Sequence, residues 1–210
     1  KISYVTPRLL GVRGGVSFTP SSDVRGLDRN TTGSDVPPRA KLENVFEFGL
    51  NASRRLRESG VRLRAGLSYS AAEVEAPEGF EGVYEDRLDV FSAGGEIELQ
   101  DAFRFGLNWI SADEGLRESG DYTAWSAGLG FEQGDWRASV VYGESEIPSA
   151  DAQADGLSIA VARTVNDYLT FGLSWQDRAV SPDVASTLER RAFEASSEGI
   201  VIEITLSFEK

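Results

Sequence analysis

Hydrophobic and polar residues alternate along most of this chain with a period of two. In the stretch GVRLRAGLSYS, Gly60 to Ser70, one set of alternate positions is mostly apolar and the other holds arginine, glycine and serine. The alternation recurs in FRFGLNW from Phe103 and in IVIEITLSF from Ile200. Successive side chains of a β-strand point to opposite faces, so the pattern predicts strands with one dry and one wet face.

This pattern predicts an all-β fold built from antiparallel, up-and-down strands. The eleven segments that alternate are residues 1–6, 9–19, 41–53, 59–72, 88–100, 103–112, 121–132, 136–146, 156–165, 168–178 and 198–208. All seven prolines fall between these segments, where a missing N–H breaks no sheet hydrogen bond. Because no break in composition divides the chain, we expect residues 1–210 to form a single domain.

The connections between the predicted strands alternate strictly in length. Short ones lie near Pro7 and at residues 54–58, 101–102, 134–135 and 166–167, and long ones at residues 20–40, 73–87, 111–120, 144–155 and 177–197. In an up-and-down meander, alternate connections lie at the same end of the sheet. One end therefore carries tight turns and the other carries long loops, a polarity typical of outer-membrane β-barrels.

Composition excludes several classes of function. A net charge of -13 argues against nucleic acid as a partner, because phosphate binding needs a basic surface. The chain has neither Cys nor His, so it lacks a thiol nucleophile, an imidazole base and the usual nitrogen and sulfur ligands of zinc. Glu96 and Glu98 share a face and resemble a glycosidase pair, but that spacing is commonplace in strands. We therefore expect no enzymatic activity, and no catalytic, cofactor or metal site.

Alternation alone does not tell which face is inside. A soluble lipocalin-like barrel packs its apolar face inward around an apolar ligand, whereas a membrane barrel turns that face to lipid. Aromatic residues on the apolar face gather near strand ends, as two interfacial girdles would require: Tyr4, Phe18, Phe103, Phe131, Trp136, Trp175 and Phe208. The alternative is that aromatic residues simply favour strands. The lengths of the connections favour lipid outside.

With lipid outside, the polar face lines a lumen. Its charges, placed by parity, are Lys1, Arg13, Arg62, Arg64, Arg104 and Arg137 against Glu43, Glu47, Glu96, Glu98, Glu132 and Glu203. So many charges are costly in a dry interior, because each unpaired buried ion costs several kcal/mol. A hydrated channel removes that cost. Arg13, Arg62 and Arg64 could equally be paired with Glu43 and Glu47 on the strand between them.

The long loops carry a surplus of acid. One loop holds Glu73, Glu75, Glu78, Glu81, Glu85 and Asp86, and another holds Asp113, Glu114, Glu118 and Asp121. A field of this sign concentrates cations, which predicts a mild cation preference. The alternative is that these loops are simply solvated and bridge lipopolysaccharide through divalent ions.

Both ends of the chain carry a resemblance to a known family. The opening KISYVTPRLLGVRGGVSFTP resembles a hairpin of the Gram-negative general porins, through Tyr4, Thr6, Pro7 and Arg8 and then the run from Gly11 to Pro20. The segment GIVIEITLSF, which ends in Phe208, is similar to the last porin strand with its terminal aromatic residue. Glu209 and Lys210 follow that aromatic residue, whereas the family usually ends on it.

The resemblance implies a sixteen-stranded barrel in the bacterial outer membrane, assembled as a homotrimer. Such a barrel passes small hydrophilic solutes and ions, and it contacts membrane lipid and lipopolysaccharide. If Phe208 closes strand sixteen, Lys1 begins strand six and the chain is a C-terminal portion that lacks the family's constriction loop. The alternative is a complete smaller barrel with a structural or adhesive role.

Overall fold

The computed structural model describes residues 1–22, 41–56, 58–76, 78–79, 81–113, 121–147, 152–166, 168–182 and 195–206. The all-β prediction is confirmed, and each predicted segment overlaps one strand. The strands are β1 (Ile2–Val5), β2 (Val12–Ser22), β3 (Lys41–Leu56), β4 (Val61–Glu75), β5 (Arg87–Leu99), β6 (Phe103–Ala112), β7 (Tyr122–Gln133), β8 (Trp136–Ile147), β9 (Ala152–Asn166), β10 (Leu169–Pro182) and β11 (Ala195–Leu206).

Several strands are longer than their sequence pattern predicts. β3 continues through Arg54 and Arg55, and β9 begins at Ala152 rather than at residue 156. The main chain of these residues still pairs with the neighbouring strand, as Arg55 does with Arg62 and Ala152 does with Ile147. Because this pairing uses backbone groups, it persists where the apolar alternation has already stopped.

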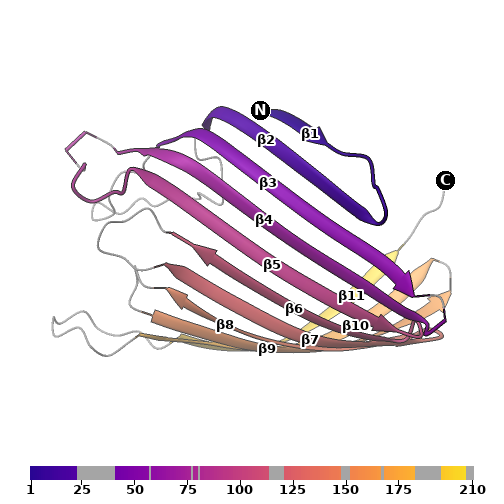
Figure 1. Cartoon of the computed structure of the whole chain (residues 1–210). Coiled ribbons are helices and arrows are strands. Elements are labelled where there is room, and N and C mark those ends of the chain that lie inside the picture. Colours follow the sequence, from indigo (N-terminus) through magenta and orange to yellow (C-terminus); the bar gives the residue numbers. More distant parts are fainter. Residues whose placement is uncertain are drawn as a thin grey trace.

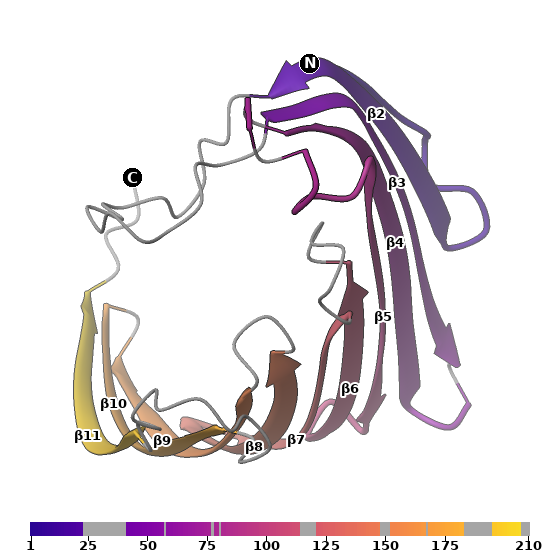
Figure 2. The same ribbon diagram turned by 90° about the vertical axis from the view of Figure 1, so that its left-hand side faces the viewer.

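The strands form one antiparallel sheet in strict sequence order, from β1 to β11 (Figure 1). Figure 2 shows that the sheet bends along its width, so that one of its faces is concave. β1 and β11 lie at opposite ends of the strand order, and no pairing joins them within the described residues. The described sheet is therefore an open, curved wall with two edges.

This wall has almost no hydrophobic core of its own. Ala72 is the one buried hydrophobic residue in the described ranges, while large apolar side chains such as Leu107, Leu129 and Ile159 remain 49%, 58% and 48% exposed. Soluble proteins seldom leave an apolar surface of this extent uncovered. No helix in the described part of the chain is long and apolar enough to cross a membrane.

One irregularity changes which residues share a face. Asn44 has a left-handed backbone with φ of 50°, and the register of β3 against β4 shifts between Glu43 and Phe46. This is a β-bulge, in which one strand carries an extra residue and its alternation is interrupted. Positions of β3 before and after Asn44 therefore do not follow a single odd–even rule.

Candidate functional site

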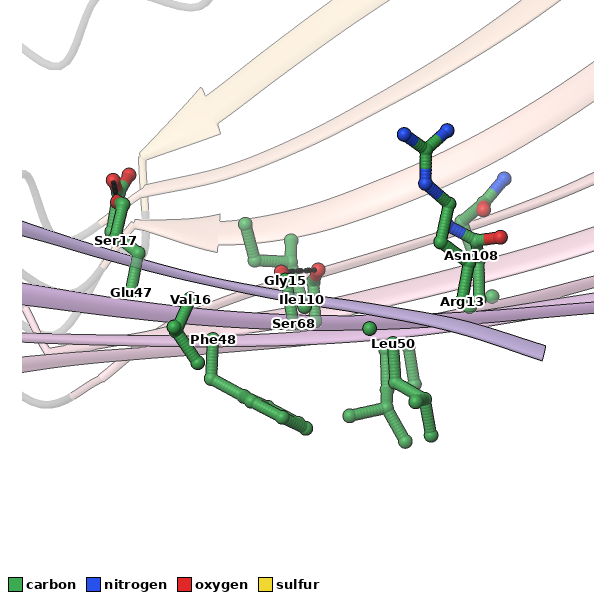
Figure 3. A pocket seen from close by; sticks show the side chains of 18 of the residues that line it. Arg13, Gly15, Val16, Ser17, Glu47, Phe48, Leu50, Ser68, Asn108 and Ile110 are labelled. Carbon is green, nitrogen blue, oxygen red and sulfur yellow. Dashed lines mark hydrogen bonds between the residues drawn. The ribbon is translucent and has the colours of Figure 1, made fainter. Parts of the chain in front are cut away.

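The register of the sheet places the polar alternate positions on one face. Arg13 lies opposite Asn51, which lies opposite Gly66, and the row continues through Gly94 and Asn108. In Figure 3, Arg13, Ser17, Glu47 and Asn108 extend toward the side where the far strands lie, while Val16, Phe48 and Leu50 extend to the other side. The polar face is thus the concave face of the sheet.

A hollow of about 1030 Å³ lies against the concave face of β1 to β7. Its floor is formed by small or uncharged side chains, because glycine, serine and asparagine occupy successive strands at the same height: Gly49, Asn51, Gly66, Ser68, Ser92, Gly94, Asn108 and Ser126. Ser68 and Ser92 hydrogen-bond to each other at 2.8 Å between their hydroxyl oxygens. The floor of the hollow therefore carries hydroxyl and amide groups on neighbouring strands.

Gly94 leaves space for the amide of Asn108. A Cβ atom on Gly94 would lie 2.3 Å from the Asn108 Oδ1 atom, closer than any real contact of this type. The Asn108 amide thus occupies the space that a side chain at position 94 would take, and it lies flat over β5.

A charged cluster lies on the same face, closer to the short turns. Glu98 is only 2% exposed, and three arginines from two neighbouring strands surround its carboxylate. The distances to the Glu98 oxygens are 3.0 Å from Arg62 Nη1, 3.1 Å from Arg64 Nη2 and 3.8 Å from Arg104 Nε. A buried carboxylate is tolerable here because guanidinium groups supply both the opposite charge and the hydrogen bonds.

Further ion pairs extend the cluster across the neighbouring strands. Arg64 also pairs with Glu96, and Arg104 pairs with Glu132 at 3.0 Å. Arg137 reaches the other oxygen of Glu132 at 3.3 Å, and Arg55 pairs with Asp101 at 2.6 Å near the short turns. Each guanidinium is thereby held along the sheet by a neighbouring carboxylate.

The structure brings together seven of the residues singled out from the sequence: Arg62, Arg64, Glu96, Glu98, Arg104, Glu132 and Arg137. Glu47 lies apart from them and binds Lys1 at 2.6 Å. Glu203 contacts Thr205 of its own strand at 3.0 Å, and Arg13 stands separately at the hollow. Sequence reasoning missed Arg55 and Asp101, because both lie in predicted turns.

One interpretation from the sequence needs correction. The alternative that Arg62 and Arg64 pair with Glu43 and Glu47 is wrong, since both arginines pair with residues of β5. Glu43 lies next to the bulge, opposite Ser21 of β2 and Glu73 of β4, and its carboxylate pairs with Lys41 at 2.5 Å.

The convex, apolar face carries aromatic groups near both ends of the strands. Toward the long loops, the Tyr142 hydroxyl and the Trp125 indole N–H both donate to Glu144, at 2.5 and 3.3 Å. Toward the short turns, Phe103 packs on Phe131 with ring centroids 5.1 Å apart, and Arg163 lies 5.1 Å from the centre of the Trp136 ring. Rings that combine an apolar body with a polar partner suit the two interfaces of a bilayer.

The loop that joins β4 to β5 carries acid at the opposite end from the Glu98 cluster. Hydrogen bonds from the backbone of Glu81 itself and of Gly79 lower the pKa of the Glu81 carboxyl. Glu81 therefore keeps its negative charge to a lower pH than an ordinary glutamate. Glu114 and Glu118 of the next acidic loop, and the terminal residues Phe208, Glu209 and Lys210, lie outside the described residues.

An antiparallel meander with a convex apolar face, aromatic belts and a polar concave face defines the wall of a transmembrane β-barrel. A family model described as Gram-negative porin matches residues 1–176, which is most of the chain. The chain belongs to the Gram-negative porin family, and its location is the bacterial outer membrane. A search of curated proteins found no match.

The buried position of Glu98 predicts an unequal effect of two similar substitutions. Glu98→Gln leaves three guanidinium groups without their shared anion, so the free energy of unfolding should fall by about 2–3 kcal/mol. Glu96→Gln removes a more exposed partner of Arg64 and should cost less than about 1 kcal/mol. Urea unfolding of the native protein from lipid vesicles measures both. Equal losses in the two variants would contradict a special role for the buried carboxylate.

Proposed function

We propose that this chain forms the wall of a water-filled channel for passive diffusion of small hydrophilic solutes and ions. The observation that carries the proposal is the concave face, where a hollow of about 1030 Å³ has a floor of glycine, serine and asparagine. Diffusion requires no reacting group, only water, width and fixed charges. Ion pairing holds the larger charged side chains along the sheet, which leaves the space above the floor open.

The pore-lining residues of this proposal are those whose side chains share the concave face with the hollow. They are Arg13, Glu47, Arg62, Arg64, Glu96, Glu98, Arg104, Arg137 and Glu203, to which Arg55, Asn51 and Asn108 are added. Glu43 also stays a candidate, because its register with β2 continues that of Glu47 without a shift.

The contacts of the apolar face argue against a soluble lipocalin-like barrel. Such a barrel would pack its large apolar side chains around a ligand on the concave side. Here Phe48 and Leu50 extend away from Arg13 and Asn108, on the convex side (Figure 3).

The two edges of the sheet favour a larger barrel over a complete smaller one. An edge strand inside a bilayer leaves backbone N–H and C=O groups without partners, at a cost of several kcal/mol each. Closing a smaller barrel from these strands would require β1 to pair with β11, and no such pairing occurs in the described residues. We therefore propose that residues 1–210 supply eleven strands of a wider barrel domain whose other strands lie outside them.

Membership of the porin family supports a homotrimer surrounded by outer-membrane lipid and lipopolysaccharide. Outer-membrane fractions run on SDS gels without heating should give a band near three times the mass of the heated band. A heated and an unheated band of equal mass would contradict the trimer.

The acidic loop between β4 and β5 predicts a mild cation preference. In a potassium chloride gradient across a planar bilayer, the reversal potential of the native protein should show potassium favoured over chloride, and more so at low salt. Replacing Glu78, Glu81 and Glu85 together by Gln should reduce the preference, because these charges focus cations at the mouth. Since the Glu81 pKa is lowered, the contribution of Glu81 to the cation preference should disappear only as the pH falls below the ordinary glutamate range.

A matched control removes charge from the opposite end of the wall. Glu58→Gln with Asp135→Asn alters two short turns and should change the reversal potential less than the loop substitutions do. A chloride preference in the unchanged protein would contradict the cation proposal, and the absence of any conductance would contradict the channel itself.

A further inference from the structure

Arg13 differs from the other cations of the concave face. Lys1, Arg55, Arg62, Arg64, Arg104 and Arg137 each have a carboxylate within ion-pair distance. Arg13 has neither an ion pair nor a hydrogen bond with any residue that the structure describes. Its guanidinium group extends over the hollow, as Figure 3 shows. Arg178, a further cation of this face, is engaged by Gln176. A guanidinium that no described side chain engages is available to a solute.

Asn51 provides a second donor beside Arg13. The two residues are direct partners in the register of β2 and β3, so their Cβ atoms lie about 5 Å apart. Arg8 donates from Nη2 to the Asn51 Oδ1 atom at 2.9 Å. Because Arg8 occupies the acceptor half of the amide, Asn51 presents its NH₂ group, which is a donor, on the other side.

The surface around this pair leaves room for a ligand. Gly15 of β2 and Gly49 of β3 face each other, two residues along their strands from Arg13 and Asn51, and both line the hollow. A Cβ atom built on Gly49 would meet no atom within 4 Å. A small solute can therefore approach the Arg13 guanidinium from the lumen without displacing protein atoms.

The local charge favours an anion. Glu47 is the one acidic residue among those that line the hollow, and it is engaged by Lys1 at 2.6 Å and by the Ser17 hydroxyl. The remaining polar groups close to Arg13 are donors or neutral hydroxyls. No free carboxylate of the described hollow competes for the guanidinium, although the whole chain carries a net charge of -13.

We propose that Arg13 and Asn51 form a subsite that transiently binds the carboxylate group of small organic anions as they pass through the channel. A carboxylate offers two acceptor oxygens in one plane, and the guanidinium fork matches that geometry. The Asn51 amide adds a third N–H donor from the next strand. The inference rests on the proposed channel, and it adds a preference for a class of solute that an acidic vestibule alone would disfavour.

The test uses the native protein in a planar bilayer at about 0.1 M potassium chloride, where screening is moderate. Glutarate added on one side should reduce the potassium chloride conductance in a saturable way. Arg13→Gln should raise the half-blocking glutarate concentration about tenfold, which corresponds to the loss of one charge-assisted hydrogen-bonded contact. The half-blocking glutarate concentration of Arg13→Lys should fall between those of the native protein and Arg13→Gln, because a lysine keeps the charge but not the planar guanidinium. Asn51→Ala should weaken the block by a smaller factor than Arg13→Gln.

Arg178→Gln is the matched control. Arg178 shares the concave face but lies on β10, where its guanidinium donates to Gln176 at 3.3 Å. The substitution removes the same charge, so a general electrostatic effect would weaken the block as much as Arg13→Gln does. Equal weakening, or no glutarate block in a protein that still conducts potassium chloride, would overturn the subsite and leave the channel standing. A protein that reconstitutes without any conductance would overturn the channel.

Discussion

The structure depends on one constraint: the backbone of a membrane wall must pair with itself. In a bilayer there is no water to satisfy N–H and C=O groups, so each strand binds its two neighbours along its length. That pairing links every strand from β1 to β11 to the next, with register shifts only at β3 and β10 in the described residues, and it uses no side chain, which leaves both faces free to specialise. Apolar residues such as Leu107 and Leu129 turn outward, and Asn108 and its neighbours turn inward.

The same arrangement explains how a charged wall remains open. Side chains that project inward, such as Arg62, Arg64 and Arg104, would narrow the lumen if they extended freely. Glu98 draws all three toward the sheet, and Glu96 and Glu132 extend the effect to the neighbouring strands. Where glycine and serine replace these residues, the hollow lies against the sheet. Arg13 is the exception, because no side chain in the described part of the chain engages it, and the proposed carboxylate subsite rests on that.

Period-two alternation was sufficient to predict the fold and the strand order, because these depend only on which residues are apolar and where chain reversals occur. The connection expected at residues 144–155 spans only residues 148–151, because β8 and β9 pair beyond their apolar alternation. The alternation was not sufficient for the ion pairs. Parity tells which face Arg62 occupies, but not whether β3 or β5 supplies its partner, since both neighbours carry glutamates. The β3 bulge at Asn44 was also not predicted, because no feature of the alternation marks the extra residue. The partners Arg55 and Asp101 follow from register, which a single strand does not encode.

The central claim is that the polar face of this sheet meets water and the apolar face meets lipid. The chain contains no cysteine, so a single cysteine can be introduced at each of four positions. Ser68 and Ser92 form a cross-strand pair on the polar face, and Leu67 and Ala93 form the adjacent pair on the apolar face. The native protein, reconstituted in lipid vesicles, would be treated with a charged, water-soluble thiosulfonate and the rate of labelling measured at each position. The account predicts fast labelling at positions 68 and 92 and little at positions 67 and 93. Fast labelling at 67 and 93 with protection at 68 and 92 would show that the hollow is dry and that the assignment of the two faces is reversed.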